Sequence, residues 1–284
     1  MNDSESKNIK LLHNVCLGII EEFVKICDEE KLTYYLSGGT LLGAVRHKGF
    51  IPWDDDADFS MPRDDYEKFL KIAPRKLSGK YKLINFKTDE NYQYYITRIQ
   101  DIETSLIETR INNDNKFTHA SIDIFPLDGT PNNRFLRKIY FLKVMIHRAM
   151  MSLSYKDSID PDRKRSLKEK ILLNTMLILP TNILFNGNKE KYKIDKMMRK
   201  YKINESENIG CLMGAYRTNQ IVPKRFFGTG RYYEFENLYL RGPELYDDYL
   251  KQMYGDYMKI PSKDNIKIHY KIVEINGHKV EEDV

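Results

Sequence analysis

Cysteine is scarce in this chain of 284 residues, which contains only three. Cys16 and Cys27 lie on one helical pattern, about three turns apart along the same face, which is too far for a disulfide bond. The odd number of cysteines fits a reducing cytoplasm. We therefore expect Cys16, Cys27 and Cys211 to be reduced core residues.

Long apolar runs and a secretory leader are also lacking. The apolar run at residues 171–185 is short for a membrane span and is interrupted by Asn174, Pro180 and Asn182. The first six residues are polar and acidic, which predicts no signal peptide. From these absences we expect a cytoplasmic protein without a transmembrane helix.

The excess of charge is small, at +5 near pH 7, with an isoelectric point of about 8.8. This favours an anionic substrate or a membrane surface as a partner and argues against nucleic acid. Hydrophobic residues make up 41% of the chain, as in globular proteins. The length allows one large domain, or a core with an appendage.

A glycine turn lies near the N-terminus. Residues 33–36 are β-branched and aromatic, as in a buried strand, and Ser37-Gly38-Gly39 ends that strand. We predict that Thr40 caps a helix over residues 41–46. A strand, two glycines and a helix N-terminus together present backbone N–H groups that can bind phosphate, although a plain strand-to-helix turn has the same pattern.

Carboxylates follow this turn closely. If a second strand begins near Asp56, its alternation places Asp56 and Asp58 on one face, with Ala57 and Phe59 in the core. Two adjacent like charges repel, and a divalent metal removes that conflict. Oxygen ligands select Mg²⁺ or Mn²⁺. The alternative is a solvated acidic turn.

Further elements follow from periodicity and turn residues. Asp123 projects alone from the apolar strand at residues 119–128, which is costly unless the carboxylate is paired or bound to metal. Asp128, before Gly129 and Pro131, is interpreted as a turn residue and helix cap. The remaining predictions are helices over residues 7–30, 62–70 and 245–253, strands over 81–86, 94–100 and 105–109, and a hairpin over 226–240.

Residues 131–201 differ from the rest because basic side chains far outnumber acidic ones and alternate with apolar runs, notably residues 139–151. One interpretation is a helical appendage whose basic groups are solvated. The other is a basic amphipathic surface that rests on an anionic membrane leaflet.

The string from Gly38-Gly39 to Asp56-Ala57-Asp58 resembles the nucleotidyltransferase fold of the DNA polymerase β type. Residues 39–58 closely resemble the LicD family, phosphocholine transferases that modify bacterial surface glycans and are distantly related to fukutin-related proteins. Members often carry Ile or Val where this chain has Ala57. Residues 122–128 and residues 249–261, with His269 downstream, resemble two further motifs of the family.

The resemblance implies an α/β (α+β) fold, a nucleotidyltransferase-type mixed-sheet core with a helical, basic insertion. We divide the chain accordingly into a catalytic core over residues 1–130, a basic helical segment over residues 131–201 that contacts the acceptor or a membrane surface, and a part returning to the core over residues 202–284.

The activity that the resemblance implies is Mg²⁺- or Mn²⁺-dependent transfer of phosphocholine from CDP-choline, or a similar headgroup from another CDP-alcohol, with release of CMP. The acceptor would be a hydroxyl of a lipid-linked cell-surface glycan or teichoic acid precursor, reached from the cytoplasm or the inner face of the plasma membrane. The catalytic and metal-binding residues implied are Asp56, Asp58 and Asp123, with Asp54 as a further ligand or neighbour. The donor-binding residues implied are Ser37, Gly38, Gly39, Thr40, Arg46, His47, Lys48 and Trp53.

Two other classes remain open. One is a nucleotidyltransferase that adds NMP to a small molecule or an RNA end, and the other is a non-catalytic protein that binds a membrane surface or nucleic acid through the basic segment. Within the favoured class, the headgroup could be choline, ethanolamine, aminoethylphosphonate, glycerol or ribitol. None of the twenty tyrosines is singled out by its pattern as part of an aromatic box for choline.

Overall fold

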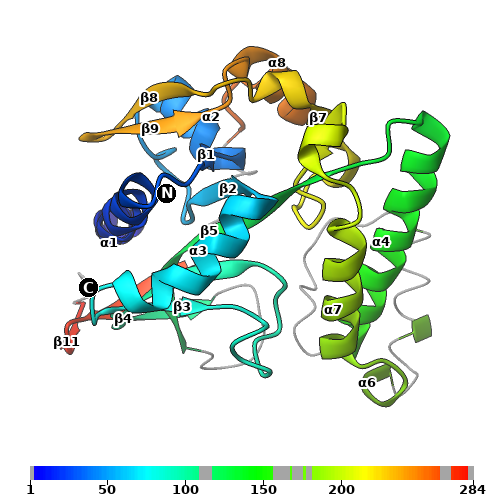
Figure 1. Ribbon diagram of the computed structural model, residues 1–284. Helices are drawn as coiled ribbons and strands as arrows, with labels where there is room; N and C mark the ends of the chain where they lie inside the picture. Colours follow the sequence, from blue (N-terminus) through cyan, green and yellow to red (C-terminus); the bar gives the residue numbers. More distant parts are fainter. Residues whose placement is uncertain are drawn as a thin grey trace.

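The computed structural model describes residues 3–108, 117–155, 167, 175–176, 181–262 and 270–280. Within these residues the main feature is a mixed sheet with the strand order β1-β2-β5-β4-β10-β11 (Figure 1). Strand β3 pairs with β4, and β6 joins β5 to β7. Only the β2–β5 pair among these is parallel. The strands are β1 (Tyr35–Leu36), β2 (Asp58–Pro62), β3 (Tyr81–Ile84), β4 (Thr97–Glu108), β5 (Phe117–Gly129), β6 (Asn208–Gly210), β7 (Ile221–Pro223), β10 (Tyr270–Ile275) and β11 (His278–Lys279).

Helices surround this sheet, which confirms the mixed α/β class. Figure 1 shows α4 and α7 side by side at one end of the molecule, and α1 beside the separate β8–β9 hairpin at the other. The helices are α1 (Asp3–Glu29), α2 (Gly38–His47), α3 (Arg63–Lys76), α4 (Arg134–Ser154), α6 (Thr181–Leu184), α7 (Gly187–Met198) and α8 (Tyr246–Tyr254). The hairpin strands are β8 (Arg231–Phe235) and β9 (Leu238–Gly242).

Helix α1 supplies much of the core, as its period predicts. Its buried residues recur every three or four positions and face the sheet, where α1 contacts β5, β4 and β10. Phe23 is fully buried and packs its ring against Phe59 of β2 and Phe69 of α3. Burying one such side chain contributes about 1.5–3 kcal/mol relative to leaving it exposed. The apolar face of α1 therefore sets the position of β2 and β5.

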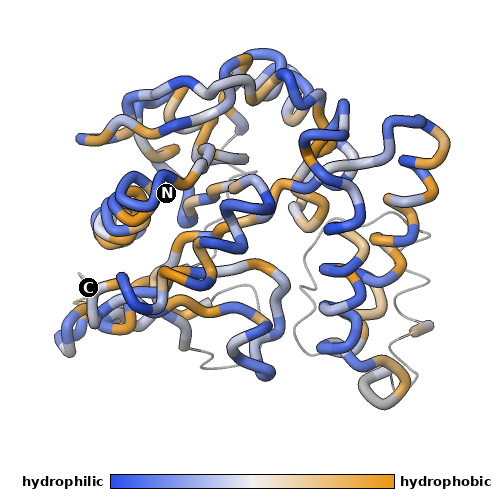
Figure 2. Tube along the Cα trace, viewed as in Figure 1, coloured by the Kyte–Doolittle hydropathy of each residue, from blue (hydrophilic) through white to orange (hydrophobic). Residues whose placement is uncertain are grey.

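Two hydrophobic clusters fill the interior. The larger lies around the sheet and contains Cys16, Cys27 and Cys211, which are buried free thiols, as expected. The smaller joins α4 and α7 to the β3–β4 region through residues such as Phe86 and Ile194. Figure 2 shows hydrophobic residues along the central strands and recurring along α4.

Strand β4 corrects the sequence prediction of two strands at residues 94–100 and 105–109. It is one strand, Thr97–Glu108, whose pairing with β5 shifts register between Asp101 and Leu106. The Thr104 hydroxyl donates to the Asp101 carbonyl and accepts from the Ala120 N–H, so the bulge is bonded within the sheet. Polar residues at the bulge interrupt the alternation, and for this reason the pattern predicted a break.

Asp128 is also different from its interpretation as a turn residue and helix cap. It lies inside β5, fully buried, and its carboxylate accepts two hydrogen bonds from Arg63, at 2.8 Å from Nε and 2.5 Å from Nη2. Helix α4 is capped instead by Asn133, whose side chain accepts from the N–H groups of Phe135 and Leu136. The Asp-Gly-Thr-Pro sequence resembled a turn, but the buried arginine keeps Asp128 in the strand.

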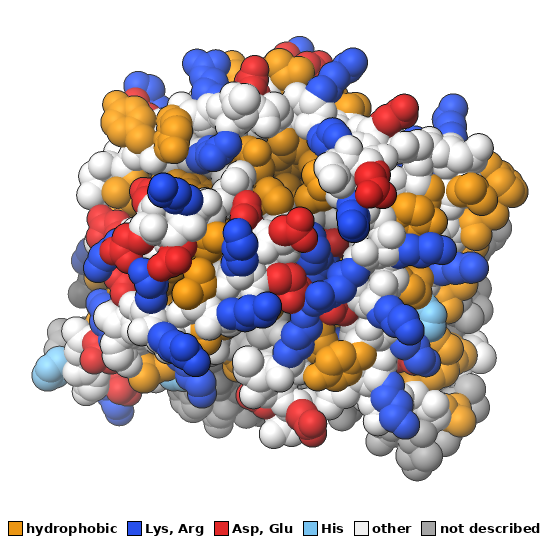
Figure 3. All heavy atoms as spheres, in the orientation of Figure 1, with side chains coloured by type: hydrophobic (Ala, Val, Ile, Leu, Met, Phe, Trp, Pro, Cys, Tyr) orange, Lys and Arg blue, Asp and Glu red, His pale blue; other side chains and the backbone are white. Residues whose placement is uncertain are grey.

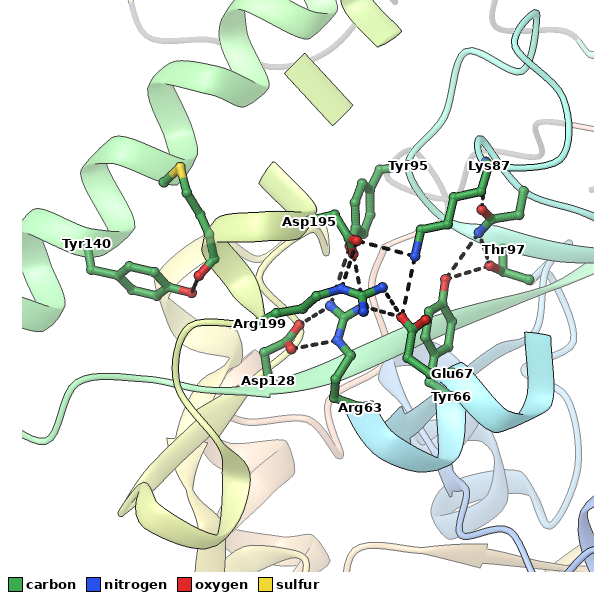
Figure 4. A network of polar contacts seen from close by, with 12 residues as sticks. Arg63, Tyr66, Glu67, Lys87, Tyr95, Thr97, Asp128, Tyr140, Asp195 and Arg199 are labelled. Atoms are coloured by element: carbon green, nitrogen blue, oxygen red, sulfur yellow. Dashed lines mark hydrogen bonds and ion pairs between the residues drawn. The ribbon is translucent and has the colours of Figure 1, made fainter. Parts of the chain in front are cut away.

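Arg63 is the centre of a network of charged side chains that joins α3, β5 and α7 (Figure 4). Besides Asp128 it contacts Asp195 of α7 at 3.1 Å, and Asp195 also accepts from the Tyr95 hydroxyl at 2.7 Å. Arg199 bonds Asp195 and Glu67, which extends the network to the surface. Figure 4 shows these side chains converging between the sheet and α7. Residues 187–199 are thus held to the core by buried ion pairs.

The C-terminal predictions agree with the structure in part. The hairpin over residues 226–240 corresponds to β8–β9, and the helix over residues 245–253 corresponds to α8. The helix over residues 62–70 is α3, although Pro62 is the last residue of β2 and not part of its first turn. Among the residues that the structure describes, no helix combines the length and the hydropathy that a membrane span requires.

Candidate active site

The glycine turn joins β1 to α2 in a manner that differs from the predicted one. Helix α2 begins at Gly38, whose positive φ of 53° suits glycine, and Ser37 is its N-cap residue. Thr40 therefore lies inside the first turn and does not cap the helix. Its hydroxyl accepts instead from the Asp58 N–H at 2.7 Å, which ties the start of α2 to the start of β2.

Strand β2 begins at Asp58, two residues later than the start that the sequence predicted near Asp56. The expected alternation is nevertheless present, because Ala57 and Phe59 are buried while Asp56 and Asp58 line a cavity. Asp58 stands opposite Asp123 in the parallel β2–β5 pair, and Asp123 stands opposite Arg98 in the antiparallel β5–β4 pair. Asp58, Asp123 and Arg98 thus form a row across three neighbouring strands.

Arg98 is the partner that the sequence reading missed. Its Nε donates to Oδ1 of Asp123 at 2.8 Å, and its guanidinium lies 4.8 Å from the centre of the Tyr94 ring. Burial opposes the charge of Arg98, but Asp123, Tyr92 and Tyr270 together raise the pKa of Arg98 well above its usual value. The signal was present: Arg98 projects alone between Thr97 and Ile99, as Asp123 does between its apolar neighbours.

The cavity has a volume of about 590 Å³, within the usual range for small-molecule sites. The acidic row and the turn form one part of its wall. The loop with Gly214, Ala215 and Tyr216 forms another, together with Gln220. Nothing in the sequence pattern singled out this loop. The carboxylates and Arg98 thus face a space large enough for a nucleotide-sized ligand.

Burial and, after it, mutual repulsion disfavour the charged form of the carboxylates in the site. Burial raises the pKa of Asp58 well above its usual value, and the charges of Asp56 and Asp123 add to that shift. Burial also raises the pKa of Asp54, again with help from Asp56. Several carboxyl groups therefore share a region where water does not screen them, and a cation would relieve the repulsion.

The contacts of the two glycines support a metal fit. A Cβ atom at Gly38 would lie 2.9 Å from Oδ2 of Asp58, and one at Gly39 would lie 2.6 Å from Oδ2 of Asp54. The glycines thus let these carboxylates approach the start of α2. In the described part of the chain, no group of three His, Cys, Asp or Glu side chains surrounds a metal position by itself. The arrangement fits Mg²⁺, which commonly takes one or two carboxylates together with substrate phosphates.

The predicted donor-binding residues are divided by the structure. Ser37 and Gly38 line the cavity, whereas Gly39 and Thr40 lie in the helix behind it. Arg46, His47 and Trp53 form a separate group at the other end of α2. Arg46 Nε donates to His47 Nε2 at 2.9 Å, and Arg46 also donates to the Tyr257 carbonyl. The Arg46 guanidinium lies 6.0 Å from the centre of the Trp53 ring, which His47 contacts edge to face.

The remaining predicted residues are placed as follows. Lys48 forms an ion pair with Glu234 of β8 at 2.9 Å, on the exposed side of the hairpin. It is not part of the cavity wall among the residues that the structure describes. The two ends of helix α2 are about 15 Å apart, which explains why the residues at its C-terminal end lie away from the cavity. His269 lies outside the described residues.

Comparison with known proteins identifies relatives of this chain. Residues 31–169 match the family model described as "LicD/FKTN/FKRP, nucleotidyltransferase domain". The lipopolysaccharide cholinephosphotransferase LicD of Haemophilus influenzae is 33% identical over 264 residues, which cover 90% of this chain and 93% of the relative. An uncharacterized protein of Rickettsia typhi is 25% identical over 152 residues, covering 52% of this chain and 47% of its own length. On the strength of the Haemophilus match across nearly the whole length of both proteins, this chain belongs to the LicD family.

Proposed function

We propose that this protein transfers phosphocholine, or a similar phospho-alcohol headgroup, from a CDP-alcohol to a hydroxyl of a cell-surface glycan, with release of CMP. The observation that carries the proposal is the row of Asp58, Asp123 and Arg98 beside the α2 N-terminus, at the wall of one cavity. The name of the Haemophilus relative supports phosphocholine as the transferred group. We also propose that the sheet and its carboxylates represent the nucleotidyltransferase fold of the polymerase β type.

The start of α2 would bind the donor diphosphate. Ser37 and Gly38 line the cavity at the N-terminus of α2, where the positive end of the helix dipole favours an anion. Asp56 and Asp58 would hold Mg²⁺, which when bound would neutralise the diphosphate charge. Arg98 would stabilise the negative charge that develops on the transferred phosphoryl group.

Asp123 would act on the acceptor. Arg98 engages its Oδ1, so Oδ2 is the oxygen available to the acceptor hydroxyl or to the cation. In the reaction the hydroxyl oxygen forms a bond to the β-phosphorus, the one that bears choline, and the bond from that phosphorus to the bridging oxygen breaks. CMP leaves with the bridging oxygen, and the hydroxyl proton passes to Asp123 and then to water.

The composition of the cavity wall favours a cationic headgroup. Tyr94, Tyr216 and Tyr270 line the same cavity as the carboxylates. Tyrosine ring faces attract quaternary ammonium groups, and a surplus of carboxylates has the same effect. This supports choline or ethanolamine over the neutral glycerol and ribitol headgroups.

Ligand-induced stabilisation tests the donor. We expect CDP-choline with Mg²⁺ to raise the melting temperature, because a ligand at about 100 times its Kd stabilises the folded state by about 2.7 kcal/mol. CDP-ethanolamine, CDP-glycerol, CDP-ribitol and CTP serve as comparisons, each with Mg²⁺ and with EDTA. A shift with CTP alone would replace our proposal with nucleotidyl transfer, in which the acceptor carries NMP.

The metal-binding assignment is tested by substitution. Asp58→Asn is expected to reduce CMP release at least 100-fold while the protein remains folded, because it removes one carboxylate of the site. The control is Asp64→Asn, which makes the same change at an exposed position in the first turn of α3. Full turnover by Asp58→Asn would refute the assignment.

A further inference from the structure

Helix α4 has two apolar faces. One face carries Tyr140, Phe141 and Val144, which are buried against the cluster that includes Ile194 of α7. The opposite face remains exposed: Phe135 by 70%, Ile139 by 37%, Leu142 by 59% and Ile146 by 49%. The spacing of these four residues places them in one stripe, about half a turn away from Val144. We refer to these four residues as the α4 stripe.

The α4 stripe needs an explanation because it covers nothing in the described part of the chain. Single exposed apolar residues are ordinary on protein surfaces, but a continuous row of four large ones indicates an interaction surface. Figure 3 shows hydrophobic side chains gathering at the upper right edge, where Figure 1 places the start of α4. Lys and Arg side chains lie close to them in the same view.

The charge around the stripe is positive. Helix α4 has no acidic residue in the sequence Arg134–Ser154. Arg134, Lys138 and Lys143 are exposed beside the stripe, and no ion pair holds any of them within the described residues. Large apolar side chains flanked by Lys and Arg are typical of helices that lie in the interface of an anionic membrane. The stripe also lacks polar groups that would select a particular protein partner.

The same helix is fixed to the cavity. Arg148 of α4 donates to the carbonyl oxygens of Leu212 and Gly214, at 3.0 and 3.1 Å, and Gly214 lines the cavity. Any surface that α4 contacts is therefore held at a constant position relative to the cavity wall. A lipid-linked acceptor would meet the cavity from that surface.

We propose that the α4 stripe, with Arg134, Lys138 and Lys143 beside it, docks this protein on an anionic lipid membrane. The apolar residues enter the boundary between headgroups and acyl chains, and the basic residues bind the lipid phosphates. This inference goes beyond the transfer reaction and does not depend on the identity of the donor.

Vesicle flotation of the full-length protein tests the proposal. We expect binding to phosphatidylcholine vesicles that contain phosphatidylglycerol, and binding at least tenfold weaker to phosphatidylcholine alone. Phe135→Ser/Leu142→Ser should lower the affinity for the anionic vesicles at least tenfold. Lys138→Ser/Lys143→Ser should lower it about tenfold or more, and only at low salt, because the charge attraction is screened.

The matched control is Tyr232→Ser/Tyr239→Ser, which removes two exposed aromatic side chains from the β8–β9 hairpin. It should bind vesicles like the original protein, and all variants should keep their melting temperature. Turnover of a CDP-alcohol with a water-soluble acceptor should be the same in the stripe variants, so a failed assay there concerns the reaction and not the docking.

Three results would overturn the proposal. The first is no binding of the original protein to anionic vesicles. The second is an equal loss of binding in the hairpin control. The third is a dimer in sedimentation experiments that Phe135→Ser/Leu142→Ser dissociates without a change in vesicle binding, because the stripe would then contact a second copy.

Discussion

Arg98 contacts Asp123 in a region crowded with carboxylates, and we propose that it does more than balance the charge of Asp123. Its guanidinium is planar and keeps its charge, so it can bind one oxygen of Asp123 and still offer N–H groups to a phosphoryl oxygen. A lysine at the same position would supply the charge without that geometry. The difference between the two side chains can therefore be measured.

Arg98→Lys is expected to lower kcat/KM for the CDP-alcohol about 10- to 100-fold with little change in melting temperature, because the charge is kept but the fixed direction of the donors is lost. Arg231→Lys, an exposed position on β8, is the control. CMP release at several donor concentrations would separate kcat from KM. Unchanged kinetics would mean that Arg98 only balances the charge of Asp123.

Lys191 of α7 is a different case, because its charge opposes folding. The side chain is fully buried, and its ammonium donates to the Tyr92 carbonyl. Burial lowers the pKa of Lys191 from 10.5 to about 8. Below pH 8 Lys191 is protonated in both the folded and the unfolded chain. Burying its charge then lowers the free energy of unfolding by the full amount, on the order of 3 kcal/mol. Between about pH 8 and 10.5 the unfolded chain binds more protons, and the free energy of unfolding rises with pH.

Lys191→Met should therefore raise the free energy of unfolding at pH 7 by about 2 kcal/mol, after about 1 kcal/mol is subtracted for the lost hydrogen bond. The gain should shrink as the pH rises from 8 towards 10. Urea unfolding at pH 7 and pH 9.5 measures both effects, with Lys196→Met on the exposed side of α7 as the control. A loss of stability at pH 7 would contradict this account of the buried charge.

Local sequence was sufficient for some site residues and not for others. Asp56 and Asp58 could be placed in the cavity because strand alternation is a local property, and Asp123 because an isolated charge in an apolar strand needs a partner. The contact between Arg98 and Asp123 could not be predicted from the sequence, since it depends on the register of β4 against β5. Arg46 and Lys48 are near the turn in sequence, but the length of α2 separates them from it.

At the scale of elements, periodicity predicted α1, α3, α8 and the β8–β9 hairpin, all of which have one clear apolar face or a tight turn. It was less successful with β4. Polar residues interrupt the alternation of this strand, but a bulge lets the strand stay paired with β5 on both sides of the interruption. It was wrong about Asp128 because the partner, Arg63, is 65 residues away. Elements defined by their own sequence were predicted, and features defined by a distant partner were not.

The network between α3, β5 and α7 gives a prediction at this scale. Asp128→Asn keeps the shape of the side chain but removes the negative charge that faces the buried Arg63 guanidinium. Removing one partner of a buried ion pair lowers the free energy of unfolding by about 3–5 kcal/mol. Urea unfolding measures the loss. Asp247→Asn, which breaks an exposed pair with Lys251, should have a much smaller effect. If the variant cannot be purified folded, Arg63→Met/Asp128→Leu should restore folding, because it removes both buried charges together.

At the scale of the whole molecule, the basic segment is attached to the core by apolar and ionic contacts. The Arg63 network and the cluster around Tyr140 hold α4 and α7 to the sheet, and Arg148 holds α4 to the cavity loop. The strand order could not be predicted, since β5 lies between β2 and β4, and β4 pairs on its other side with β10, which is more than 160 residues later in the chain. Composition alone did indicate that this segment differs from the rest.

The pairing of β10 with β4 affects how the protein folds during synthesis. The Asn8 side chain donates to the Ile272 carbonyl and accepts from the Ile272 N–H, so α1 is bonded to a strand 264 residues later. While the ribosome is still translating, β4 has an unpaired edge and α1 has an uncovered flank. Because exposed strand edges promote aggregation, we expect the emerging chain to be prone to aggregation until β10 pairs with β4.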